Sequence, residues 1–186
     1  MTLLVRHVFQ GVFLCTAFLI HFPTQAHLIE AQRGSLNLRD RAAYLVLSIP
    51  VSALSGVDDD GDAALSQTEL RRHADIISVQ IKAGVQLLHA ENILPLKLVM
   101  LEVMPPPHSS PDNLARHLVV MGWFDLGGLL SARNTSNAEI DKRLRLRFRL
   151  FGNNPGERQQ NIVISRRNEK KWLRFTPERI EYRMFY

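Results

Sequence analysis

The sequence contains almost no cysteine: Cys15 is the single one in 186 residues. No disulfide can form within the chain, so its fold must rest on the burial of apolar side chains. Glycine and proline number 10 and 9, too few for a collagen-like or low-complexity chain. With 46% hydrophobic and 22% charged residues, the composition is typical of one globular domain of this length.

The N-terminal segment lacks charge, but not over a length that suits a transmembrane helix. Residues 8–20 (VFQGVFLCTAFLI) form thirteen uncharged residues, whereas a membrane-spanning helix needs about 20. Arg6 precedes this segment, and Thr24-Gln25-Ala26 offers small side chains for cleavage, an order typical of a signal peptide. We expect a signal peptide over residues 1–26, a single β-rich domain over residues 27–186, and a periplasmic or secreted location.

Positive charge is concentrated in the last part of the chain. Residues 141–186 contain 13 basic and 5 acidic residues, whereas residues 27–140 contain 9 and 13. Four arginines alternate with apolar residues, which in a strand places all four on one face: Arg143, Arg145, Arg147 and Arg149. This face could bind an anionic surface of the cell envelope, or it could be a solvated face paired with neighbouring acids. We expect no nucleic-acid partner, because the chain is predicted to be exported.

Hydrophobic periodicity predicts many short strands and one long helix. The helix is expected over residues 66–88, because apolar residues recur there at spacings of three and four after a capping-box sequence at Ser66. Loops are expected over residues 104–113, which are rich in proline, and 127–140. The expected strands are 34–38, 42–51, 94–103, 115–126, 142–151, 159–166, 171–176 and 180–186. This order predicts a mostly β protein, an antiparallel β-sandwich with a long helix inserted near the N-terminus.

Residues 58–69 (DDDGDAALSQTE) have the twelve-residue spacing of an EF-hand loop, within an EF-hand-like segment over residues 52–88. Calcium takes about six to eight oxygen ligands, and a loop that wraps one ion presents side chains inward at alternate positions. The carboxylate at position twelve would be bidentate and come from the first turn of the next helix. The predicted Ca²⁺ ligands are the side chains of Asp58, Asp60, Asp62, Ser66 and Glu69 and the backbone carbonyl of Ala64.

The loop departs from the EF-hand pattern at position six, where Ala63 replaces the usual glycine. A non-glycine residue in the left-handed conformation costs about 1–2 kcal/mol, which predicts a weaker site. A second loop of this kind is missing from the sequence, so the usual pairing of two EF-hand loops would need another protein molecule. We expect a dissociation constant of about 10⁻⁴ M or weaker.

The alternative to a calcium-binding protein is a protein that binds copper. Cleavage after Ala26 would leave His27 at the N-terminus of the mature chain, where its amine and imidazole could chelate copper. The protein would then be a secreted copper-binding protein or enzyme. No arrangement of nucleophile, base and orienting group is visible in the sequence, so the first interpretation is a non-enzymatic protein with no catalytic residues.

The order of features resembles a group of uncharacterised bacterial exported EF-hand proteins. The resemblance rests on an exported start ending at Ala26-His27, short strands, the loop that begins Val57-Asp58-Asp59-Asp60-Gly61-Asp62, and the helix that starts around Glu69-Leu70. More distantly, the chain is similar to the extracytoplasmic domain of HupE/UreJ-like accessory permeases. This similarity implies an accessory module of the periplasm or cell envelope, with an envelope protein or a membrane permease as partner. The membrane helices of such permeases are missing from this sequence, so transport is not implied.

Overall fold

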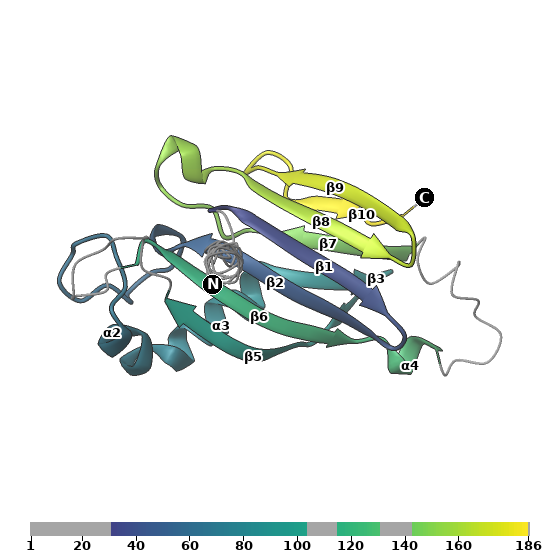
Figure 1. Ribbon diagram of the computed structural model, residues 1–186, viewed down its shortest axis with the longest axis horizontal. Helices are drawn as coiled ribbons and strands as arrows, with labels where there is room; N and C mark the ends of the chain where they lie inside the picture. Colours follow the sequence, from purple (N-terminus) through teal and green to yellow (C-terminus); the bar gives the residue numbers. More distant parts are fainter. Residues whose placement is uncertain (1–30, 104–114, 131–142, 186) are drawn as a thin grey trace, which may run out of the picture.

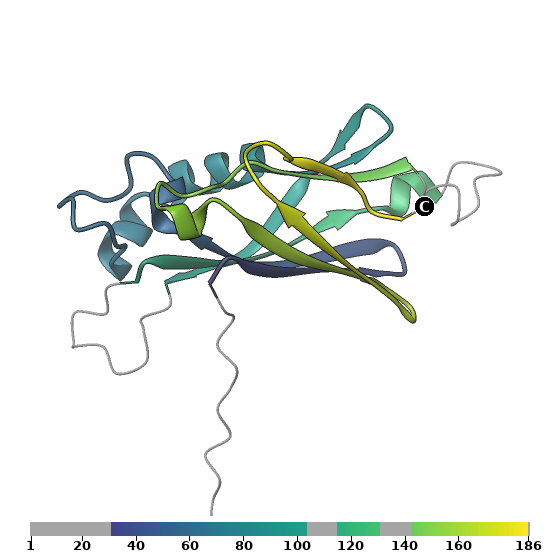
Figure 2. The same ribbon diagram turned by 90° about the horizontal axis from the view of Figure 1, so that it is seen from above.

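The computed structural model describes residues 31–103, 115–130 and 143–185, which form two β-sheets packed face to face and a few short helices. Figures 1 and 2 show the six-stranded sheet in front of the four-stranded sheet. The helix α2 (Gln67–Arg72) lies at one end, and α3 (Ala74–Gly84) leads into the first strand of the four-stranded sheet. The strands pair antiparallel except for one parallel pair, β1 with β8. The expected mostly β, sandwich-like fold class is confirmed.

The six-stranded sheet has the order β5-β6-β2-β1-β8-β9. The strand expected over residues 42–51 is present as β2 (Ala42–Pro50), in which Leu45, Leu47 and Ile49 are fully buried while Tyr44 is half exposed on the opposite face. The register shifts between Leu98 and Met100 where β5 pairs with β6, which is a bulge. The strands of this sheet are β1 (Arg33–Arg39), β2 (Ala42–Pro50), β5 (Leu96–Val103), β6 (His117–Asp125), β8 (Gln160–Arg166) and β9 (Glu169–Phe175).

The four-stranded sheet has the order β10-β7-β3-β4. It consists of β3 (Val85–His89), β4 (Asn92–Leu94), β7 (Leu144–Phe148) and β10 (Glu181–Arg183). The inward faces of both sheets meet in one continuous apolar core, in which Phe124, Phe148 and Phe175 are the largest fully buried side chains. Burial of this kind is what a chain without disulfides requires.

The prediction of a single helix over residues 66–88 is wrong. The structure has two helices, α2 (Gln67–Arg72) and α3 (Ala74–Gly84), which are separated at His73 by a non-helical backbone. Residues 85–88 belong to β3, which forms five register pairs with β7. Gly84 ends the helix because its carbonyl accepts the Arg149 N–H (2.8 Å) and the Leu150 side chain packs where a Cβ would lie. Pairing between distant segments therefore overrides the local helical pattern.

The strand expected over residues 94–103 is also corrected. Leu94 ends β4 in one sheet and Leu96 begins β5 in the other, so the chain changes sheets at Pro95. Proline has no N–H to continue a ladder, which suits this crossing point. The remaining elements are short: η2 (Val51–Ala53), α4 (Gly127–Leu130) and η3 (Pro155–Glu157). α4 lies in the loop expected over residues 127–140, while the loop over 104–113 lies outside the described residues.

Candidate metal centre

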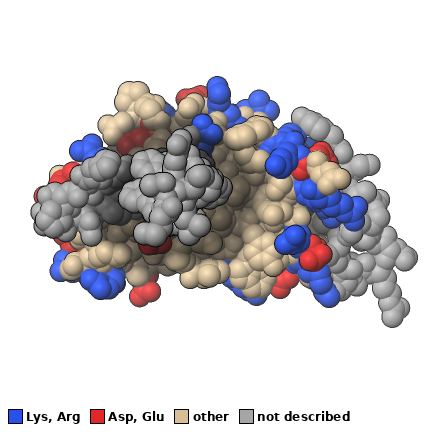
Figure 3. Space-filling view, in the orientation of Figure 1, with Lys and Arg blue, Asp and Glu red and all other residues tan. Residues whose placement is uncertain are grey.

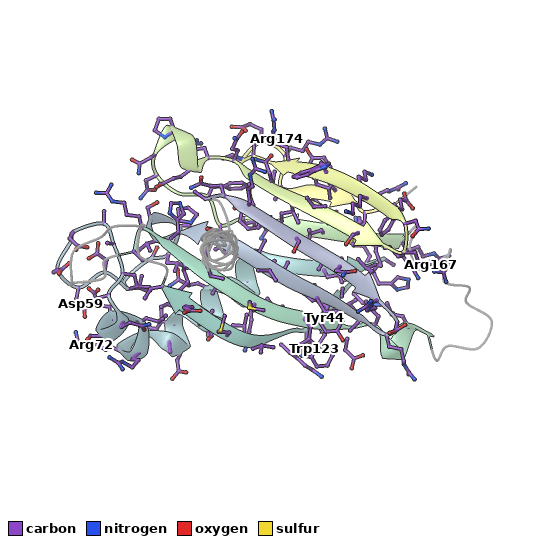
Figure 4. The ribbon with its side chains drawn as sticks, viewed as in Figure 1. Tyr44, Asp59, Arg72, Trp123, Arg167 and Arg174 are labelled. Atoms are coloured by element: carbon purple, nitrogen blue, oxygen red, sulfur yellow. The ribbon has the colours of Figure 1, made fainter. Side chains whose placement is uncertain are left out.

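The EF-hand-like loop joins η2 to α2 at one end of the sandwich. Two buried apolar residues anchor it, one just before the loop and one at its eighth position. Val57 and Leu65 are buried in the core, whereas Asp60 and Asp62 between them are exposed. Figure 4 shows Asp59 and Arg72 at this end of the molecule. The loop is therefore a polar turn fixed between two hydrophobic anchors.

Carboxylates inside the loop accept most of the hydrogen bonds that shape it. Asp58 accepts the N–H groups of Gly61 (2.8 Å) and Ala63 (2.9 Å). Asp60 accepts the Asp62 N–H at 3.2 Å, and Asp62 accepts the Ala64 N–H at 2.8 Å. These bonds direct successive aspartates toward the inside of the turn, which is the arrangement that a chain wrapping a cation needs.

Three of the four predicted carboxylates come together at the centre of the loop. One oxygen from each of Asp58, Asp60 and Glu69 lies within 4.8 Å of the others. Oxygens that bind one calcium ion at about 2.3–2.6 Å lie at most about 5 Å apart, so the spacing fits a shared ion. Asp62 does not belong to this group of three, and Ala64 is buried beside the Leu65 anchor.

Glu69 is the buried member of the group and also caps α2. Its Oε1 accepts the Asp59 N–H, and its Oε2 accepts the N–H and the hydroxyl of Ser66, each at 2.8 Å. The Ser66 hydroxyl in return accepts the Glu69 N–H at 3.2 Å. The capping box predicted at Ser66 is therefore present. Each carboxylate oxygen has two lone pairs, and both pairs of Oε2 are already used. Glu69 could therefore keep all these bonds only while it binds an ion through Oε1; bidentate binding would require Oε2 to give up a bond to Ser66.

The pKa values of the three carboxylates differ because their surroundings differ. The Ser66 and Asp59 N–H groups lower the pKa of Glu69. Burial works to raise the pKa of Asp58, but the N–H donors of Gly61 and Ala63 outweigh it and the pKa is lowered. The Asp62 N–H favours the charged form of Asp60, yet a partial loss of hydration and the charges of Asp62 and Glu69 raise its pKa. Asp60 is thus the carboxylate whose charge the metal-free loop tolerates least.

His73 and Arg72 hold the start of the loop against the helices, a role that the sequence did not suggest. The His73 Nε2 atom lies 2.8 Å from Asp59 Oδ1, and Arg72 pairs with the other oxygen of Asp59. The His73 hydrogen bond is the largest cause of the lowered pKa of Asp59. Because His73 lies at the break between α2 and α3, this contact joins the helix break to loop position two.

Position eight of the loop, Leu65, pairs with a backbone segment from elsewhere in the same chain. Leu65 forms an antiparallel bridge with Ala115, two residues before β6. Here the sandwich supplies the partner backbone.

The arginine face of β7 is partly neutralised by neighbouring acids. Arg145 forms salt bridges with Glu91 (3.0 Å) and Glu181 (3.1 Å), and Arg147 forms one with Glu181 (2.7 Å). Arg143 and Arg149 at the two ends are exposed. The middle pair therefore fits the interpretation of a solvated face with paired charges.

A second polar cluster, also missed from the sequence, connects η2 to the turn before β8. The Ser52 hydroxyl donates to Glu157 Oε2 at 2.6 Å, and the Asn154 N–H donates to the same oxygen at 3.2 Å. His117 lies near Glu157 and contacts Gln32 (2.8 Å between side-chain nitrogens). The Ser52 hydroxyl is thus engaged by the Glu157 carboxylate, and this bond ties η2 to the turn before β8.

The remaining sequence predictions fall outside the described residues. These are the signal peptide over residues 1–26 and the copper ligand His27. Within residues 31–103, 115–130 and 143–185, no helix is long and apolar enough to cross a membrane. Comparison with protein-family models and with curated proteins found no match to this chain.

Proposed function

We propose that this protein is an exported calcium-binding β-sandwich that serves as a non-enzymatic module of the periplasm or cell envelope. The observation that supports calcium most directly is the convergence of Asp58, Asp60 and Glu69 within 4.8 Å. Hydrogen bonds between loop residues already hold these carboxylates in place. Hard oxygen ligands on a loop of this spacing favour Ca²⁺ over transition metals.

The ion would stabilise the junction between the two β-sheets and the helices. The loop is tied to the core through Val57 and Leu65, to α2 through Glu69, and to the entry of β6 through Ala115. Calcium would cancel the repulsion that raises the pKa of Asp60. With a dissociation constant of about 10⁻⁴ M and calcium at about 1 mM, binding would add about 1.4 kcal/mol to the free energy of unfolding.

Calorimetric titration of the purified protein with Ca²⁺ and, separately, Mg²⁺ tests the proposal. We expect saturable binding of Ca²⁺ and clearly weaker binding of Mg²⁺, which demands a more regular octahedral site. Glu69→Gln should weaken calcium binding by about tenfold or more, because it removes a charged ligand. Asp75→Asn, at an exposed acid in the first turn of α3, is the matched control and should leave calcium affinity unchanged.

A titration without heat, together with no rise in melting temperature at millimolar calcium, would show that the loop is an acidic turn without an ion. If Glu69→Gln and Asp75→Asn lowered the calcium affinity by the same factor, general negative charge rather than the loop would attract calcium.

A further inference from the structure

A hollow of about 610 Å³ lies where two β-hairpin turns come together at one end of the strands of the six-stranded sheet. The turns connect β1 to β2 and β8 to β9, and they meet because β1 and β8 run parallel and in register. Figure 4 places Arg167 of the second turn at the opposite end of the molecule from Asp59 of the calcium loop. We call this hollow the hairpin pocket; its polar lining residues include Asn37, Arg39, Asp40, Arg166, Arg167 and Lys170.

The hairpin pocket has an excess of positive charge. Four basic side chains line it, against the single lining acid Asp40. Arg166 is partly buried, and burial together with the charge of Arg167 lowers its pKa, while Glu169 acts in the opposite direction. Counting Glu169 with Asp40, these described residues carry four positive and two negative charges. Figure 3 shows Lys and Arg gathered over this end of the molecule.

The floor of the pocket adds neutral polar groups to these charges. Asn37 of β1 and Ser165 of β8 are register partners in the parallel pair, and both line the hollow. An amide and a hydroxyl can donate hydrogen bonds to the same anion that the cations attract. Two exposed aromatic side chains stand beside the pocket: Tyr44 is the register partner of Asn37, and Trp172 follows Lys170 by two residues on β9.

We propose that the hairpin pocket binds the phosphate or diphosphate group of a phosphorylated ligand. A phosphate ester carries about −1.5 to −2 charges at neutral pH, which matches the local excess of positive charge. Arginine guanidinium groups fit phosphate oxygens in a bidentate way, and the pocket has three of them. The exposed rings of Tyr44 and Trp172 can contact the rest of such a ligand. This inference does not depend on calcium binding.

The ligand could be a soluble sugar phosphate or the head group of a phospholipid, since both present the same chemistry. Calorimetry with pyrophosphate and with glucose 1-phosphate tests the soluble source. Sedimentation with vesicles of phosphatidic acid in phosphatidylcholine, compared with phosphatidylcholine alone, tests the lipid source. Arg167→Gln with Lys170→Gln removes two exposed pocket charges, and Arg174→Gln together with Lys97→Gln removes two charges of the same face outside the pocket.

We expect binding to at least one of these probes, reduced by about tenfold or more in the pocket variant and by less than about twofold in the control. Binding should also weaken as salt concentration rises. Pyrophosphate or glucose 1-phosphate binding assigns a soluble ligand; binding to the phosphatidic acid vesicles alone assigns a lipid head group. The proposal would be overturned if none of the probes bound, or if the pocket variant and the control variant lost the same fraction of their affinity. Circular dichroism of each variant verifies that the fold is kept.

Discussion

Leu65 and Ala115 form an antiparallel bridge in which the Leu65 N–H donates to the Ala115 carbonyl at 2.9 Å and the Ala115 N–H donates back at 3.4 Å. Both side chains are fully buried. This bridge anchors the apolar position of the EF-hand-like loop to the segment that enters β6. The loop is therefore integrated into the β-sandwich and does not need a second loop to fix its backbone.

Ala63 carries the left-handed backbone that position six of the loop requires, with a φ of 63°. We expect the loop to keep this conformation with and without calcium, so the strain should lower folding stability rather than calcium affinity. We expect Ala63→Gly to raise the free energy of unfolding by about 0.5–1 kcal/mol. Calcium affinity should change by less than about threefold. Chemical denaturation and calorimetry would measure the two effects separately.

The control for this substitution is Ala83→Gly, at an exposed position inside α3. There the added backbone freedom should destabilise the protein by about 0.5–1 kcal/mol. A large gain in calcium affinity with unchanged stability in Ala63→Gly would contradict our account of the strain.

Gly84 is required by packing at the junction of α3 and β3. A Cβ at this position would lie 2.5 Å from Leu150 Cδ2, so the Leu150 side chain would have to move. Gly84→Ala should destabilise the fold by about 1–3 kcal/mol, although helix propensity alone predicts a gain of about 1 kcal/mol. Gly156→Ala, where a Cβ has open space, should be close to neutral. A stabilising effect of Gly84→Ala in urea denaturation would show that the helix end is loosely packed.

Glu69 should make the protein sensitive to acid. Its pKa is lowered in the folded state, so its ionised form stabilises the fold at pH values above the ordinary value near 4.5. This stabilisation is lost as the pH falls through the lower, folded-state pKa. With chelator present, wild type should therefore lose more stability than Glu69→Gln between about pH 5 and pH 3. Parallel pH profiles of the two proteins would contradict this prediction.

The sequence predicts the features that depend on local pattern and misses those that depend on distant partners. The alternation of Leu45, Leu47 and Ile49 identifies a half-buried strand, and the spacing from Asp58 to Glu69 identifies a loop that does bring carboxylates together. In contrast, the sequence of β3 predicts a helix, because its pairing with β7 depends on distant residues and not on its own pattern.

The hairpin pocket shows the same limit for a candidate site. Asn37 and Ser165 are far apart in the chain and become neighbours through the parallel pairing of β1 and β8. Neither turn alone carries a recognisable motif. The contact between His73 and Asp59 was likewise not predictable. It depends on the break between α2 and α3, whereas the hydrophobic periodicity predicts one continuous helix there.

Asp60→Asn tests the central claim most directly, because Asp60 is the carboxylate whose charge is disfavoured in the metal-free loop. Its raised pKa means that the ionised side chain destabilises the fold at pH values above that pKa. At pH 7 with chelator, the variant should therefore be as stable as wild type or more stable. With saturating calcium it should be less stable, because it has lost a ligand and stabilisation follows affinity for the folded state.

The measurement is the melting temperature of wild type, Asp60→Asn and the control Asp75→Asn at pH 7, each with chelator and with calcium. Our account predicts that the difference between Asp60→Asn and wild type changes from neutral or positive in chelator to negative in calcium, while Asp75→Asn shifts equally in both. If Asp60→Asn differs from wild type by the same amount in the two conditions, the loop binds no calcium through Asp60 and the account is contradicted.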